Sequence, residues 1–534
     1  MQTNTFFLKT IPWLLTLLNS IQLITADLSS RDSNHHTSPS RYVFAHFMVG
    51  IVSNRASATD YDRDMQLARR AGIDAFALNI GADAFTDTQL DYAYASAATN
   101  HMKVFLSFDF NSWDPAESSA VGAKIAKYAN QTAQLSVDDK VFVSTFIGDA
   151  LNVADVRAKA GVPIFFAPNF SPESSNFKEL DAAFNWMGWP NNGANKAPSS
   201  SSNLTVRDGD VAYMNALAGK DYIAPVSPWF FTHYGPEVSY SKNWVFPAEG
   251  QWVQRWQDLL GLGARFVEIV SWNDYGESHY VGPLPHGAWL TLATPFIRAF
   301  HAGATSPSKY IKHDLIVYWY RPNPLSLKCD ATDTTMLAAS NSSGDYFNGK
   351  PNGWETETDS IFVTAFLKSP GNVTVVSGSG AFQFNAAQGV NIFTVPMRVG
   401  SQIFGLWRKG KIVLQETSPR NVTEICACGN YNFNAYLGRV PASRGNDQLP
   451  SAGTALLTKG IRVPADQCVA VTGKVEEIAE DVDGSVSLSE STSESSTSSE
   501  SESESSSSTN QKRSWRLPNR WEWIRGWRDF VDLG

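Results

Sequence analysis

The chain has 534 residues, of which 43% are hydrophobic and 12% aromatic, so it is long enough for two or three domains with large cores. Its formal net charge is −9, but this charge is concentrated in residues 475–510, which contain no Lys or Arg, so the rest of the chain is near neutral. The ten acids of this segment are Glu476, Glu477, Glu480, Asp481, Asp483, Glu490, Glu494, Glu500, Glu502 and Glu504. Because nucleic-acid binding needs a basic face, this composition excludes a nucleic-acid partner from the expected classes.

The first 26 residues have the pattern of a secretory signal peptide. Lys9 precedes an apolar region, and cleavage is expected near the small residue Ala26. A permanent transmembrane helix is the weaker alternative, because the apolar run is short and is interrupted by polar residues such as Asn19 and Gln22. Residues 27–40 are polar and are expected to form a flexible segment.

Residues 41–305 alternate short apolar runs with segments of helical periodicity. The runs predicted as strands are residues 43–50, 75–81, 103–110, 140–148, 163–170, 184–190, 222–230 and 265–274. Gly72 and Gly161 stand where the intervening helices would end, and residues 286–303 are expected to form a closing helix.

Near-continuous apolar strands that alternate with helices favour a parallel sheet covered on both faces. Eight such units in about 260 residues match a closed (β/α)8 barrel of the TIM type, an α/β fold. An open doubly wound sheet is the alternative, although the Gly-rich phosphate turn that often marks it follows none of the early strands.

In a barrel the C-terminal ends of the strands carry the functional side chains. Three carboxylates lie at such ends: Asp109 after the third strand, and Asp274 and Glu277 in the stretch SWNDYGESHYVGP (271–283) after the eighth. The candidates for substrate binding at the same ends are His46, Asn79, Trp113, Trp186, Trp229, His233, Trp272, Asn273, Tyr275, His279 and Tyr280.

Carboxylates in an aromatic-walled site are what glycoside hydrolysis requires. One protonated acid gives a proton to the leaving oxygen, and one carboxylate activates water or attacks the sugar. Asp274 and Glu277 are close enough in sequence to couple electrostatically. Alternative interpretations are a polar turn that caps the next helix for these two acids, and a local backbone contact for Asp109. Glu268, in the middle of its strand, either points into the barrel or forms a buried salt bridge.

Residues 306–474 change to a β-rich texture, with apolar runs at 315–321, 360–367, 372–378, 391–397 and 411–416 that predict an all-β, sandwich-like accessory domain. The four cysteines, Cys329, Cys426, Cys428 and Cys468, are an even number and favour disulfides, with Cys426 and Cys428 each expected to pair with Cys329 or Cys468. Neither a metal site nor a cofactor is expected, because no His/carboxylate or His/Cys cluster has the required spacing.

Secretion would make the five Asn-x-Ser/Thr sequons candidates for glycosylation: Asn130, Asn203, Asn341, Asn372 and Asn421. Residues 475–510 form an acidic Ser/Glu-rich linker that is too poor in apolar residues to fold. Residues 511–534 form a Trp/Arg-rich tail that either lies on a membrane or wall surface or is an exposed, weakly structured end.

Several motifs in order resemble glycoside hydrolase family 71, the fungal endo-α-1,3-glucanases or mutanases. They are VFAHFMVG, GIDAFALNIG, FLSFDFN, VFVSTFIG, APVSPWFFTH, SWNDYGESHYVGP and YWYRPNP, from residue 43 to residue 324. The resemblance implies a TIM-type barrel with a β-sandwich and inverting hydrolysis of fungal wall α-1,3-glucan, and it assigns the catalytic acids to Asp109, Asp274 and Glu277. The loop IVSNRASATDYD (51–62) departs from the family pattern, which leaves fine substrate preference open.

We therefore expect a secreted, possibly wall-associated, monomeric endo-α-1,3-glucanase. Glu277 is expected to be the general acid, and Asp274 or Asp109 the base that orients water. The alternatives are a catalytically inactive α-glucan-binding wall protein and a hydrolase of a different polysaccharide.

Overall fold

The computed structural model describes residues 40–173, 175–193, 196–234, 242–282, 287–329, 349–426, 431–442, 471–472 and 474–475. The expected signal peptide, flexible segment, acidic linker and Trp/Arg-rich tail fall outside these ranges, apart from the bordering residues 40 and 475. Within the described ranges, no helix has the length and apolarity needed to cross a bilayer.

A parallel sheet contains strands at seven of the eight predicted runs, and its eighth strand, Ala182–Phe184, precedes the predicted run 184–190 and shares only Phe184 with it. These strands are β1 (Tyr42–Met48), β2 (Ala75–Ile80), β3 (Lys103–Asp109), β5 (Lys140–Phe146), β6 (Ile164–Asn169), β7 (Ala182–Phe184), β8 (Asp221–Val226) and β11 (Phe266–Ile269). They pair in the order β6-β5-β3-β2-β1-β11-β8-β7, and a short β4 (Ser136–Val137) joins β5 antiparallel. Burial of both faces of these strands explains their near-continuous apolar sequences.

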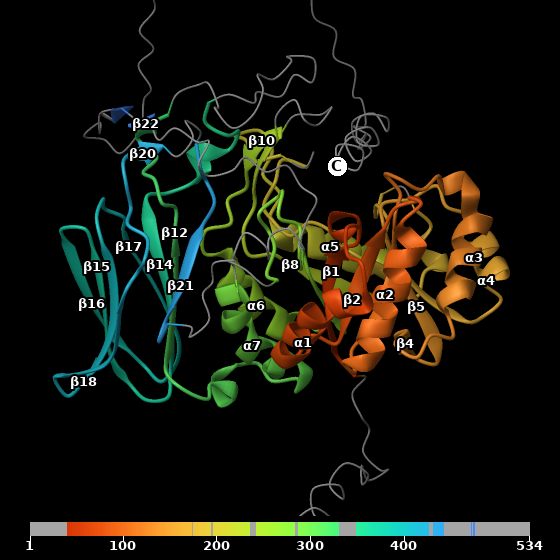
Figure 1. The fold of residues 1–534 in the computed structure, drawn as a ribbon, viewed down its shortest axis with the longest axis horizontal. Helices are drawn as coiled ribbons and strands as arrows, with labels where there is room; N and C mark the ends of the chain where they lie inside the picture. The colour runs from red at the N-terminus through yellow and green to blue at the C-terminus, as the bar shows by residue number, and fades with distance from the viewer. Residues whose placement is uncertain are drawn as a thin grey trace, which may run out of the picture. The chain divides into compact units, whose positions relative to one another are not determined.

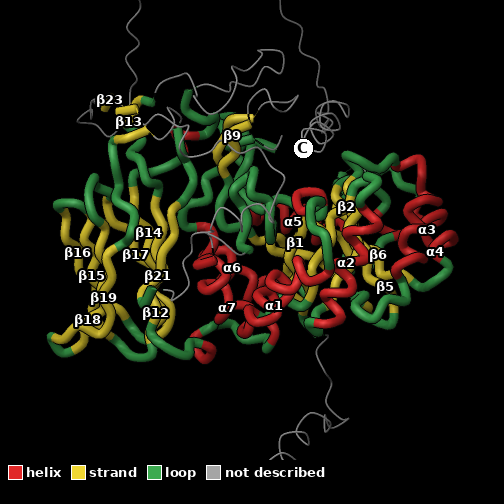
Figure 2. The backbone as a smooth tube through the Cα atoms, viewed as in Figure 1, coloured by secondary structure: helices red, strands yellow, loops and turns green. Residues whose placement is uncertain are grey.

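Helices alternate with the parallel strands, and Figure 2 shows them around the strands in red. They are α1 (Asp62–Ala71), α2 (Thr86–Thr99), α3 (Ser118–Tyr128), α4 (Val153–Ala160), α5 (Val206–Leu217), α6 (Gln251–Leu262) and α7 (Gly287–His301). Gly72 ends α1 at φ 98° and Gly161 ends α4 at φ 64°, in the left-handed region that glycine adopts at little cost. Both predicted helix ends are therefore confirmed.

The two end strands of this sheet, β6 and β7, lie next to each other without a ladder of their own among the described pairings. The backbone N–H of Asp181 donates to the carbonyl of Phe166 at 3.0 Å, and Asn169 Nδ2 donates to the carbonyl of Phe184 at 2.9 Å. The predicted closed barrel is thus confirmed only as a curled parallel sheet with flanking helices.

Two antiparallel sheets follow, in the order β17-β14-β12-β21 and β16-β15-β18-β19 (Figure 1). Their strands are β12 (Leu315–Tyr320), β14 (Ser360–Leu367), β15 (Gly371–Ser377), β16 (Gly380–Ala386), β17 (Gly389–Pro396), β18 (Gln402–Arg408), β19 (Lys411–Thr417) and β21 (Tyr436–Val440). Residues of both sheets share one core, in which the rings of Tyr318 and Phe404 stack at 3.7 Å. This arrangement agrees with the sandwich-like prediction.

Short strands complete the described structure: β9 (Phe231–Tyr234) with β10 (Lys242–Val245), β13 (Leu327–Lys328) with β23 (Lys474–Val475), and β20 (Ile425–Cys426) with β22 (Val471–Thr472). A disulfide joins Cys329 to Cys426 across 97 positions, one of the pairings that the sequence allowed. Cys428 and Cys468 lie outside the described residues.

Candidate active site

The chain leaves β11 at Ile269 and continues as residues 271–282, here called the acid loop. The backbone N–H of Trp272 donates to the carbonyl of His46 at 2.7 Å, which places the start of the loop against β1. Asn273 clamps the last residue of β1, because its Oδ1 accepts the Met48 N–H at 2.8 Å and its Nδ2 donates to the Met48 carbonyl at 3.1 Å. The acid loop is therefore held at the C-terminal ends of the parallel strands.

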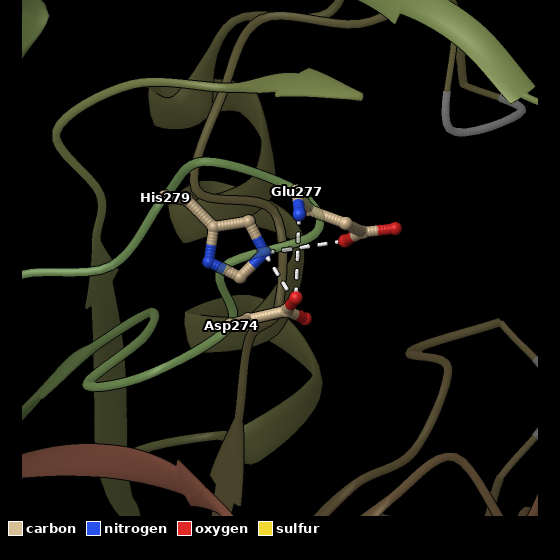
Figure 3. Close-up of side chains that lie close together, drawn as sticks. All are labelled: Asp274, Glu277 and His279. Carbon is tan, nitrogen blue, oxygen red and sulfur yellow. Dashed lines mark hydrogen bonds and ion pairs between the residues drawn. The ribbon is translucent and has the colours of Figure 1, made fainter. Parts of the chain in front are cut away.

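Asp274, Glu277 and His279 form one cluster on the acid loop (Figure 3). His279 Nε2 lies 3.1 Å from Glu277 Oε2 and 3.6 Å from Asp274 Oδ2. The Glu277 N–H donates to Asp274 Oδ1 at 3.3 Å, and the Asp274 N–H donates to Ser271 Oγ at 2.9 Å. The loop backbone thus fixes Asp274, while Glu277 keeps 17% of its side chain exposed.

Aromatic rings from two other strand ends enclose His279, which is fully buried. Its ring stacks on Phe230 at 5.7 Å between centroids, and Trp189 and Trp186 lie at 5.1 and 6.5 Å. Trp189 and Phe230 belong to the predicted runs 184–190 and 222–230 and were not among the predicted binding residues. Their contacts give the acid cluster an apolar wall.

Asp109 and Asn79 meet on the neighbouring strands β3 and β2. Asn79 Nδ2 donates to Asp109 Oδ2 at 3.3 Å, and the Asn111 N–H donates to Asp109 Oδ1 at 2.9 Å. Burial raises the pKa of Asp109, because the loss of solvation outweighs these two donors and the nearby His46. A carboxyl group at this strand end is thus shifted towards its protonated form.

His46 on β1 and Glu268 on β11 form a buried pair, with His46 Nδ1 2.7 Å from Glu268 Oε1. Both side chains are at most 1% exposed, and burial raises the pKa of Glu268 despite the imidazole. The His46 ring lies 4.9 Å from Trp186, the same ring that approaches His279. Glu268 therefore forms the buried ion pair that was one of its two predicted roles, and Trp186 connects this pair with the acid cluster.

Among the residues that the structure describes, one set has the geometry to hold a metal ion. Asp274, Glu277 and His279 each offer one ligand atom, and these atoms lie within 4.8 Å of one another. A hydrogen-bonded imidazole between two carboxylates gives the same spacing, so this geometry does not favour a metal over a proton. No metal site was predicted, because the prediction rested on the spacing of possible ligands along the chain. It did not include the folding of the acid loop, which brings these three side chains together.

Other predicted binding residues have packing contacts. Trp272 is fully buried, with its indole N–H donating to Asp64 Oδ1 at 2.9 Å, and Trp229 is 1% exposed and donates to the carbonyl of Phe433 at 3.0 Å. Trp113 is 8% exposed and donates to the carbonyl of Ile80 at 3.0 Å. These contacts bury the three indoles, so little of their ring surface is exposed to a ligand.

Three further candidates lie at the edge of the site. Tyr275 and Tyr280 pack edge to face at 4.7 Å, and burial raises the pKa of both hydroxyls. His233 lies on β9, where its Nδ1 is 3.1 Å from Asn243 Oδ1. The structure brings together His46, Trp186, Asp274, Glu277 and His279. Asn79 and Asp109 contact each other farther along the sheet, on β2 and β3, which are the second and third strands from β11.

Among the predicted glycosylation sites, Asn130, Asn203 and Asn421 are exposed and Asn372 is partly exposed. Asn341 lies outside the described residues. The four described sequons are thus on the surface.

Two supporting contacts were missed by the sequence analysis. Arg55 Nη2 donates to Asp64 Oδ2 at 2.7 Å, so a buried ion pair from the unusual loop 51–62 and α1 supports Trp272. Ser278 of the acid loop contacts Asn434, which precedes β21. The sequence carries no local signal for these contacts, because Asp64 and Trp272 are 208 positions apart and Ser278 and Asn434 are 156 positions apart.

The family model for glycosyl hydrolase family 71 matches residues 39–449. A mutanase of Penicillium rubens is 37% identical over 454 residues, which cover 81% of this chain and 94% of that protein. A glucan endo-1,3-alpha-glucosidase of Schizosaccharomyces pombe is 35% identical, covering 75% of this chain and 95% of that protein. The ascus wall endo-1,3-alpha-glucanase of the same yeast is 26% identical, covering 75% and 98%.

Solved structures give a more distant likeness. A GH99 endo-alpha-mannosidase of Bacteroides thetaiotaomicron has a TM-score of 0.38 at 11% identity, covering 50% of this chain and 99% of that chain. A likeness at this level carries no argument about substrate or mechanism.

Proposed function

The chain belongs to glycosyl hydrolase family 71, and from this premise we propose that it hydrolyses the α-1,3-glucosidic bonds of fungal wall α-glucan at internal positions. The names of the mutanase and of the endo-1,3-alpha-glucosidase support the linkage. The observation that carries the proposal is the pairing of Asp274 with Glu277 at a strand end, beside an imidazole and an aromatic wall. We also propose that β6 and β7 close the sheet into the barrel that positions this site.

Glu277 is assigned as the general acid. Its Oε2 accepts from His279, its side chain is 17% exposed, and Figure 3 shows its second oxygen directed away from His279. That second oxygen points away from the imidazole and can present a proton to the glycosidic oxygen. Protonation of the leaving oxygen is the step that makes an alcohol leave at moderate pH.

The base is either Asp274 or Asp109. The facing oxygens of Asp274 and Glu277 lie within 4.8 Å, whereas an inverting pair stands about 6.5–9.5 Å apart to leave room for water. This spacing supports Asp109 as base with Asp274 assisting. The direct coupling to Glu277 supports Asp274 instead, as does the raised pKa of Asp109, which favours the protonated form of that carboxyl. Inversion itself comes from the resemblance to the family.

Two substrates separate the acid from the base. On linear α-1,3-glucan, Glu277→Gln is expected to lose at least about 10³-fold in kcat/KM, because the leaving oxygen is no longer protonated. On an α-1,3-glucan oligosaccharide with an activated aryl leaving group, Glu277→Gln should retain turnover, since that group leaves without a proton. Asp109→Asn and Asp274→Asn are measured alongside, and the base variant should lose both reactions.

The exposed Glu117→Gln is the matched control, because it removes one carboxylate without touching the acid loop. Normal activity of Glu277→Gln on linear glucan would refute its role as the acid. Release of sugar from a different glucan and none from α-1,3-glucan would refute the proposed linkage.

The second candidate, an inactive α-glucan-binding wall protein, predicts sedimentation with α-glucan without release of reducing sugar. The described acids oppose it, since a binding protein has no need of a proton donor beside a carboxylate. Secretion, wall association and a monomeric state are proposed with the enzyme. The names of the relatives support an external substrate, and the detection of a cleaved, glycosylated chain in culture medium would test secretion.

A further inference from the structure

His279 was expected to bind substrate, but its position gives it a different role. We propose that His279 is a positioning residue that donates its Nε2 proton to Glu277 beside Asp274, and so fixes which oxygen of Glu277 carries the catalytic proton. The inference rests on the proposed hydrolase function and deepens the description of its site.

The ring of His279 is held by two neighbouring aromatic rings and by its own backbone. It is fully buried, it stacks on Phe230 with 19° between planes, and Trp189 lies 5.1 Å away. Its carbonyl accepts the Ser271 N–H at 3.0 Å, and the preceding Ser278 turns the chain with φ 61°. A ring fixed in this way directs Nε2 at the acids and leaves a polysaccharide no path to it.

The surroundings also determine the tautomer. Nε2 faces two carboxylate oxygens at 3.1 and 3.6 Å, whereas Nδ1 is buried and has no hydrogen-bond partner in the described structure. A proton on Nε2 satisfies Glu277 Oε2, while the other tautomer would set a nitrogen lone pair against two carboxylates and bury an N–H without an acceptor. The Nε2–H tautomer is therefore favoured.

The charged groups facing His279 in the described structure come from its own loop. Asp274 and Glu277 lie within ion-pair distance, while the side chains packed against it from the β7 and β8 ends, Trp186, Trp189 and Phe230, do not titrate. The next titratable pair, His46 with Glu268, lies on β1 and β11 and contacts Trp186 through the His46 ring.

The hydrogen bond has a measurable consequence. A donor to a carboxylate stabilises the ionised form more than the neutral acid, so its removal lets Glu277 keep its proton to higher pH. A lost hydrogen bond to a charged group corresponds to a shift of about one pH unit in the activity profile, towards alkaline pH. A ring that serves only for packing would change activity equally at every pH.

Three variants of the full chain separate these roles. His279→Gln places an amide N–H close to the position of Nε2, His279→Asn places it near Nδ1, and His279→Phe keeps an aromatic ring without a donor. The kcat/KM of each is measured from pH 3 to pH 8 on soluble α-1,3-gluco-oligosaccharides, with a thermal unfolding curve for each variant at both limits.

His279→Phe and His279→Asn are expected to lose about 10- to 100-fold and to shift the profile by about one unit to alkaline pH, while His279→Gln keeps the profile within a few tenths. Unshifted profiles in all three variants, or full activity of His279→Phe, would overturn the positioning role. If the wild type cleaves a different glucan, that result refutes the proposed α-1,3 linkage. The pH profiles are then measured on that glucan, and they still test the positioning role of His279. A wild type that cleaves no glucan refutes both proposals.

Discussion

At the scale of single residues, the site combines carboxyl groups in unequal surroundings. Asp109 is 8% exposed and shares its oxygens with two N–H donors, and burial nevertheless raises its pKa. Glu277 is partly exposed and accepts from an imidazole. Acids whose surroundings differ in this way can hold different protonation states at one pH. The shift of Asp109 towards its protonated form weighs against Asp109, and for Asp274, as the base.

The raised pKa of Asp109 gives a stability prediction. A carboxyl whose folded pKa lies above its unfolded value stabilises the fold at low pH, and this contribution is lost as the pH rises through the folded pKa. The pH range over which this stability is lost therefore begins near 3.8, the ordinary pKa of an aspartate, and extends to higher pH. Asp109→Asn is expected to match the wild type in free energy of unfolding near pH 3 and to exceed it at pH 7.

Denaturant unfolding curves at the two pH values check this expectation. The control is Asp139→Asn, which removes a carboxylate on a surface turn. A larger loss of stability at pH 7 than at pH 3 in Asp109→Asn would mean that the ionised form is the stabilised one.

The interior pair of His46 and Glu268 shows what sequence could not reveal at this scale. Each residue was noted separately, as a strand-end histidine and as an acid of open role. Their contact spans 222 positions and depends on the register that places Phe44 opposite Glu268 in the parallel pairing of β1 and β11. Pairing register between distant strands is set by the whole sheet, so no local pattern carries it.

At the scale of elements, the acid loop is attached on three sides. Asn273 fixes it to the end of β1, and the Phe231 N–H donates to the carbonyl of Glu277 at 3.2 Å. Ser278 contacts Asn434 in the segment before β21, the strand that pairs with β12. The segment that leads into β21 therefore helps to hold the loop that carries the proposed catalytic acids.

The contact between Ser278 and Asn434 is expected to matter for turnover. Ser278→Ala and Asn434→Ala should each lower kcat several-fold, because the loop that carries Glu277 loses an anchor. The double variant should lose no more than either single one, since both substitutions remove the same contact.

A double-mutant cycle on kcat measures this coupling, and Asn385→Ala, at an exposed position of β16, is the control. Additive losses from the two substitutions would show that the contact does not link the accessory sheets to catalysis.

The elements themselves were largely predictable. Seven of the eight parallel strands follow from apolar runs bounded by glycine-ended helices, because both faces of each strand are buried. The antiparallel strands β16, β18 and β21 were missed. In β16 partly buried residues alternate with exposed ones, and β21 is short, so the apolar signal is weaker than in the parallel sheet.

At the scale of the whole molecule, the parallel sheet with its helices and the antiparallel sheets share a packed boundary. The indole of Trp289 on α7 meets that of Trp319 on β12 at 5.1 Å, and Phe296 meets Phe366 at 6.1 Å. Trp319 also donates to the carbonyl of Glu249, just before α6, and Figure 1 shows α6 and α7 facing the antiparallel strands. An interface of large aromatic side chains favours a fixed arrangement of the two parts.

The separate predictions rest on one claim, that a family 71 chain with Asp274 and Glu277 at a strand end cleaves α-1,3-glucan by acid/base chemistry. The most direct test is proton NMR of the first products released from linear α-1,3-glucan by the full chain, recorded before the anomers equilibrate. We expect signals of internal cleavage with the new reducing end in the β configuration. Products with the α configuration would contradict inversion, and the absence of any released sugar would contradict the hydrolase itself.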